Sequence, residues 1–166
     1  MTFWEEIIDR HYPADRKVRG ILLSHSRSVA DEALAIAARL HLAIPPDEIE
    51  AAAMLHDIGI IATDAPGIDC HGTEPYLIHG AIGADMLRAD GADEVYARVA
   101  ERHTGAGLTA DTDRGRYSST RSSFSSGKVL YASDAARTAD MLCRLLLQQR
   151  WRRRAEATRK GRGVDG

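Results

Sequence analysis

The sequence has few of the features that mark secreted, disulfide-stabilised or membrane proteins. Its only two cysteines, Cys70 and Cys143, lie far apart and form no CxxC pair. A disulfide framework and a cysteine-based zinc site are therefore not expected, and a reducing cytoplasm is the predicted location. No apolar run approaches the roughly 20 residues that a membrane span needs. The N-terminus has no basic segment followed by an apolar stretch, so no secretory signal is predicted.

No segment alternates apolar and polar residues well enough to predict a strand, and no internal repeat is present. Apolar residues instead recur at steps of three and four, which predicts an all-α helical bundle. With 166 residues and 44% hydrophobic content, the chain can bury one modest core. The predicted helices cover roughly residues 2–10, 15–40, 45–59, 75–89, 92–103 and 129–147, with a turn-rich loop over 61–74.

Four histidines lie one apiece on the apolar stripes of four successive predicted helices: His25, His56, His79 and His103. Asp57 directly follows the second of them. Each histidine taken alone could be a core residue with a satisfied hydrogen bond. Burying four imidazoles and a carboxylate together is costly unless something pairs with them. Such ligands suit first-row divalent ions, and facing helices of a bundle can converge on one, so the pattern predicts a metal site.

The residues around these positions resemble the HD superfamily of metal-dependent phosphohydrolases over roughly residues 3–111. The matching motifs are Leu-Leu-Ser-His25-Ser-Arg, the HDIG motif His56-Asp57-Ile58-Gly59, His79-Gly80 and His103-Thr104. Their order and spacing are similar to those of bacterial symmetrical diadenosine-tetraphosphate hydrolases and small HDIG hydrolases. The resemblance implies an HD-domain helical bundle with a central metal site.

The resemblance also implies the roles of these residues. His25, His56 and Asp57 would hold one divalent ion, while His79 and His103 would hold a second that Asp57 bridges. Asp57, His79 and His103 would be the catalytic residues in hydrolysis of a phosphate ester or anhydride, most simply in a small nucleotide-like molecule. One or two ions are expected, and iron, manganese, magnesium and zinc are not distinguished.

Two arginines near the ligand histidines are candidates for substrate binding. Arg27 follows His25 in the same turn, and Arg102 precedes His103. A guanidinium group in either place could bind a phosphate or a nucleotide. The alternative is that both are solvated surface arginines.

The charge of the chain reverses near residue 112. Residues 1–112 contain 9 Lys and Arg against 19 Asp and Glu, whereas residues 113–166 contain 13 against 5 and no histidine. We therefore predict a metal-binding core over 1–111 and an atypical basic segment over 112–166. In that family the last metal ligand along the chain is an aspartate in a motif similar to Cys-Tyr-Ala-Asp. The basic segment offers only Asp134 and Asp140, in other contexts.

We hypothesise that residues 113–166 are read one base out of frame and replace the last helices of an HD domain. Codons allowed for Met141, Leu142, Cys143 and Arg144 yield Cys-Tyr-Ala-Asp when they are read one base later. The chain would then lack its final ligand, and its activity would be reduced or absent. The DNA sequence of codons 105–150 tests this hypothesis.

Two other functions stay open. A dinuclear-iron HD oxygenase uses the same types of ligand. A non-catalytic, site-incomplete metal-binding protein could instead use the basic stretch from Arg150 to Gly163 to bind RNA by counterion release. We expect a small phosphorylated substrate rather than nucleic acid as the partner, expect no membrane, and leave a homodimer open.

Overall fold

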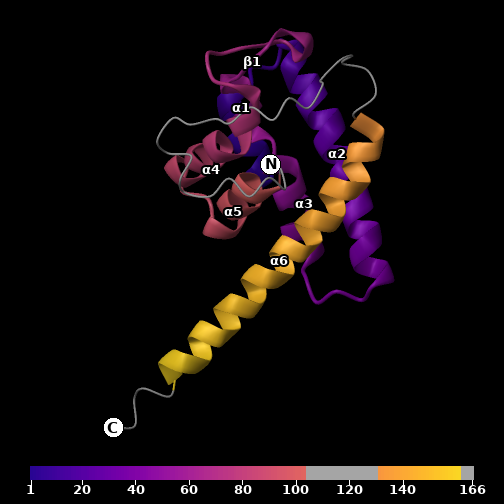
Figure 1. The fold of residues 1–166 in the computed structure, drawn as a ribbon, viewed down its shortest axis with the longest axis vertical. Coiled ribbons are helices and arrows are strands. Elements are labelled where there is room, and N and C mark those ends of the chain that lie inside the picture. The colour runs from indigo at the N-terminus through magenta and orange to yellow at the C-terminus, as the bar shows by residue number, and fades with distance from the viewer. Residues whose placement is uncertain (104–130, 162–166) are drawn as a thin grey trace.

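The computed structural model describes residues 1–103 and 131–161, and it confirms the all-α prediction (Figure 1). The helices are α1 (Phe3–His11), α2 (Lys17–Arg39), α3 (Pro46–Leu55), α4 (His79–Ala89), α5 (Glu94–Arg102) and α6 (Tyr131–Gly161). Across these ranges, no helix combines the length and the apolar character that crossing a bilayer requires.

Local capping signals explain where several helices begin. Thr2 and Glu5 form a reciprocal capping box at the start of α1, in which the Thr2 backbone N–H donates to the Glu5 carboxylate over 2.6 Å. Asp93 caps α5 by accepting from the Val95 N–H over 2.9 Å. Pro46 occupies the first turn of α3, where its missing N–H costs nothing.

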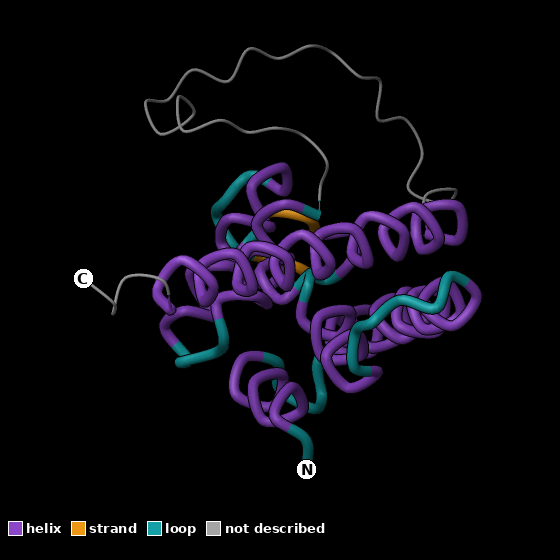
Figure 2. Tube along the Cα trace, turned by 90° about the horizontal axis from the view of Figure 1, so that it is seen from below, coloured by secondary structure: helices purple, strands orange, loops and turns teal. Residues whose placement is uncertain are grey.

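The connection between α3 and α4 contains more structure than the predicted loop. It consists of the 3-10 turn η1 (Ile58–Ala62), the antiparallel strands β1 (Asp64–Ala65) and β2 (Cys70–His71), and the 3-10 turns η2 (Pro66–Ile68) and η3 (Tyr76–Ile78). The expectation of no strand was therefore wrong. Strands of two residues, drawn in orange in Figure 2, are too short to produce an alternating pattern. The predicted start of the fourth helix at Pro75 was also wrong, because η3 precedes α4.

Helix α6 runs to Gly161, beyond the predicted end near Leu147. Its first half closes one core cluster against α2, α3 and α5. The buried residues that it contributes are Ala135, Ala139, Leu142, Cys143 and Leu146. Arginine and alanine are good helix formers, and they continue the helix after its apolar stripe has ended. The predicted boundary between residues 111 and 112 lies outside the described residues.

Hydrogen bonds of Tyr12 connect the N-terminal part of the bundle to η1, which directly follows Asp57. The Tyr12 side chain is fully buried. Its hydroxyl donates to the Ile58 carbonyl over 2.7 Å and accepts from the Ile61 N–H over 3.2 Å. Burial raises the pKa of Tyr12 well above its ordinary value, so the group stays protonated and can donate.

We expect Tyr12→Phe to lower the free energy of unfolding by about 1–3 kcal/mol, because the buried Ile58 carbonyl would lose its partner. Denaturant unfolding followed by circular dichroism measures this change. Tyr96→Phe is the matched control, since the structure records no hydrogen bond for the Tyr96 hydroxyl within the residues it describes. An equal loss in both variants would contradict the role of the Tyr12 hydroxyl.

Candidate metal centre

Three of the four predicted ligand histidines lie where a helical segment ends. His56 caps the C-terminus of α3, His103 caps the C-terminus of α5, and His79 follows η3 as the first residue of α4. The last carbonyls of a helix have no partner N–H within it. These carbonyls can therefore accept hydrogen bonds from nearby side chains.

Each of these three histidines uses such a carbonyl, three residues earlier in the chain, as a partner for Nδ1. The pairs are His56 with Ala53 (2.7 Å), His79 with Tyr76 (2.6 Å) and His103 with Ala100 (2.7 Å). A carbonyl can only accept, so Nδ1 carries the proton and Nε2 becomes the ligating atom. Our sequence reasoning missed these carbonyls. For His56 and His103, the position at the end of an apolar stripe was the signal that could have found these carbonyls; for His79, at the start of α4, the sequence offers no such signal.

The Asp57 carboxylate lies between two pairs of imidazole Nε2 atoms. Its Oδ2 atom is 3.2 Å from His56 and 3.4 Å from His25. Its Oδ1 atom is 3.1 Å from His79 and 3.0 Å from His103. Two groups of potential ligands result, each with its atoms within 4.8 Å of one another, and Asp57 belongs to both. The structure thus brings all five predicted ligands together.

The chemistry of this donor set fits divalent metal ions. Burial alone would raise the pKa of Asp57, but the surrounding His56, His103 and His79 hold that pKa well below its usual range, so the carboxylate is ionised. Burial lowers the pKa of His103 and so favours its neutral form. The His79 and His103 Nε2 atoms lie 3.1 Å apart. Lone pairs that face one another and a carboxylate repel unless a proton or a cation lies among them.

Two glycines let the ligand-bearing backbones approach closely. A Cβ atom at Gly59 would lie 2.1 Å from the His79 carbonyl oxygen and 2.5 Å from the Gly83 nitrogen. A Cβ atom at Gly80 would lie 2.5 Å from the Ala100 carbonyl oxygen. Gly59, the glycine of the HDIG motif, is therefore required for contact between η1 and α4. This contact sets the distance between Asp57 and the ligand on α4.

The two predicted substrate-binding arginines lie outside both ligand groups. Arg27 donates to Glu50 over 2.6 Å and lies over the Trp4 ring, with 5.7 Å to its centroid. Arg102 is exposed and has Glu101 at 3.9 Å. A substrate role for either stays a prediction.

Of the two candidates for the final aspartate ligand, only Asp140 has a side chain that the structure describes. The half-exposed Asp140 side chain pairs with Arg144 over 2.8 Å and belongs to neither ligand group. The side chain of Asp134 lies outside the described residues.

Comparison with known proteins gives a family match and three partial relatives. Residues 22–145 match the family described as HD domain, a range that holds all five predicted ligands. A tRNA (cytidine(56)-2'-O)-methyltransferase of Thermoplasma volcanium is 36% identical over 90 residues, which are 54% of this chain and 23% of that protein. A protein of the same name from Picrophilus torridus is 37% identical over 78 residues, or 46% of this chain and 20% of that protein.

The third relative, an uncharacterized protein of Methanocaldococcus jannaschii, is 47% identical over 58 residues, or 35% of this chain and 28% of that protein. The chain thus spans less than a third of each relative's length. No solved structure matches. None of these names bears on diadenosine-tetraphosphate hydrolases, so that narrower resemblance stays a prediction.

Proposed function

Because this chain belongs to the HD domain family, we propose that it is a metal-dependent phosphohydrolase. Its substrate would be a phosphate ester or anhydride of a small nucleotide-like molecule. The observation that carries the proposal is the buried Asp57 carboxylate, whose two oxygens each face one pair of imidazoles at 3.0–3.4 Å. A carboxylate between two pairs of imidazoles would suit two divalent ions, one held by each pair.

The ligands divide into two sets around the bridge. His25 and His56 would complete one set, and His79 and His103 the other. When bound, divalent ions neutralise phosphate oxygens and lower the pKa of a water that supplies the attacking hydroxide. Each set has three protein ligands, which leaves room for water or phosphate. In the overall reaction, the water oxygen bonds to phosphorus, the bond to the leaving oxygen breaks, and the leaving group takes up a proton.

The names of two relatives do not extend to this chain. Both are called tRNA methyltransferases, but the aligned segments are only 23% and 20% of those proteins. Methyl transfer is therefore no part of the proposal.

The rival activity is oxygen chemistry at a dinuclear iron centre, which the same ligands could support. We expect the protein loaded with Mn²⁺ or Fe²⁺ to release phosphate from a panel of nucleotides, with no oxygen uptake. An oxygen electrode and a colorimetric phosphate assay measure both quantities on the same sample. Protein stripped with a chelator is the control. Oxygen uptake without phosphate release would favour the oxygenase.

A further inference from the structure

The exposed end of α6 is a part of the molecule that the proposed function does not use. The core contacts of α6 end near Leu146 and Gln149, which are both buried. From Trp151 to Arg159 every residue is exposed except the half-buried Ala155. The twelve helical residues from 150 to 161 extend about 18 Å. In Figure 1 this yellow end reaches past the other helices. We call residues 150–161 the α6 arm.

The arm carries a large excess of positive charge. It contains five arginines, one lysine and a single acidic residue, Glu156. Two of the arginines tie the arm to the bundle: Arg150 pairs with Glu48 over 2.9 Å, and Arg153 pairs with Asp93. Within the part of the chain that the structure describes, Arg152, Arg154 and Arg159 form no ion pair. These three guanidinium groups are therefore available to an outside anion.

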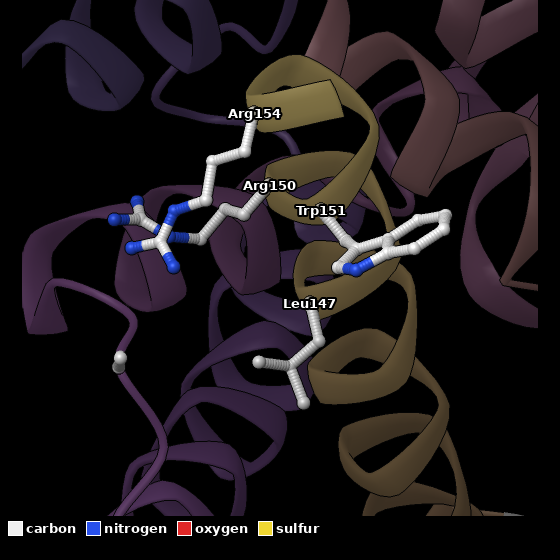
Figure 3. A pocket seen from close by; sticks show the side chains of 5 residues that line it. Leu147, Arg150, Trp151 and Arg154 are labelled. Atoms are coloured by element: carbon white, nitrogen blue, oxygen red, sulfur yellow. The ribbon is translucent and has the colours of Figure 1, made fainter. Parts of the chain in front are cut away.

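An aromatic ring lies among these charges. Leu147, Arg150, Trp151 and Arg154 line a pocket together with Ala43. Figure 3 shows both arginine side chains extending to one side of the helix, with the indole on the other side. Trp151 is 73% exposed. Because Arg150 is already paired with Glu48, Arg154 is the guanidinium group of this pocket that remains for an outside anion.

The arm lies at the end of the bundle opposite the metal centre. Glu48 and Asp93, which bind the arm, are at the N-terminal ends of α3 and α5, whereas the ligands His56 and His103 are at the C-terminal ends. Eight to ten helical residues separate them, or about 12–15 Å. The acidic bundle repels a polyanion, so binding would be confined to the arm.

We propose that the α6 arm binds single-stranded RNA. Arginine side chains around an exposed helix suit a phosphodiester backbone. An exposed indole suits an unpaired base, which offers its face for stacking as a paired base does not. This reverses the expectation, drawn from the sequence, that nucleic acid is not a partner.

Fluorescence anisotropy with a labelled oligouridine of roughly 20 nucleotides tests the proposal on the full chain. We expect binding that weakens steeply between 50 and 200 mM salt. The triple variant R152Q/R154Q/R159Q is expected to bind at least tenfold more weakly, with a salt slope reduced by about 2. Trp151→Ala is expected to weaken binding about fivefold or more while the salt slope is kept. All four side chains are exposed, so the fold is preserved.

Two controls separate this surface from general charge effects and from the metal centre. Arg144→Gln removes an arginine from the core-packed half of the same helix, and Asp57→Asn removes the proposed metal bridge. Both are expected to bind RNA like the wild type. Absence of binding at 50 mM salt, or equal binding by the arm variants, would overturn the proposal. A different result would also overturn the proposal: light scattering shows a salt-sensitive dimer, the arm variants abolish that dimer, and no RNA binds. In that case the arm would bind the acidic bundle of a second copy of the chain.

Discussion

Replacing Asp57 with Asn is expected to abolish metal binding and phosphate release together. The two carboxylate oxygens each face a different imidazole pair, so this one change weakens both ligand groups. An amide is neutral, and its NH2 group cannot act as a ligand. Because asparagine has nearly the same shape as aspartate, the packing of the buried site is retained. We expect phosphate release to fall by more than about 100-fold, beyond what loss of a supporting contact costs.

Elemental analysis and a phosphate assay on the same preparations measure this outcome. His71→Ala is the matched control, because the His71 side chain is 60% exposed and belongs to neither ligand group. Its metal content is expected to equal that of the wild type. Equal metal content in Asp57→Asn and wild type would refute the site. Metal loss without any hydrolytic activity in the wild type would leave the site standing and refute the hydrolase.

Replacing Gly59 with Ala is expected to separate η1 from α4 and to damage both stability and the second ligand group. The added Cβ would meet backbone atoms of His79 and Gly83 at 2.1 and 2.5 Å, and backbone cannot rotate away as a side chain can. Such overpacking costs about 1–3 kcal/mol. Moving α4 outward also withdraws the His79 imidazole from Asp57. We expect a lower melting temperature and the loss of one bound ion.

Gly20→Ala is the matched control, since it makes the same substitution within α2 at a position where a Cβ has no heavy atom within 4 Å. Alanine is the better helix former there, and stability is expected to rise by about 0.5–1 kcal/mol. Thermal unfolding and metal stoichiometry measure both variants. A Gly59→Ala protein that keeps the stability and the metal content of the wild type would show that η1 and α4 do not require this contact.

Particular residues show why some of the site could be predicted and some could not. The convergence of four histidines could be predicted, because each imidazole lies on the apolar face of a helix and a buried imidazole needs a polar partner. These histidines are His25, His56, His79 and His103. The neighbours of Arg27 and Arg102 could not be predicted, because a surface arginine pairs with whichever acidic residue the fold brings near; Arg27 pairs with Glu50. His11 likewise gained a partner that no local pattern indicated, since its Nε2 lies 2.6 Å from Asp90.

The hypothesis of a shifted reading frame stays a prediction, because the change in charge and composition near residue 112 begins outside the described residues. Helix α6 shows what the present codons produce: an apolar face that closes the core and a basic end that leaves it. Sequencing the DNA of codons 105–150 tests the hypothesis directly.

The order of residues alone determined the helical class, several capped helix starts and which five polar residues belong to the candidate metal centre, because periodicity and capping act within a few residues of one another. Tertiary structure alone decided which imidazoles share each Asp57 oxygen, why Gly59 must lack a side chain, and where α6 leaves the bundle. These features depend on distances between segments that are remote along the chain, and no local pattern encodes such distances.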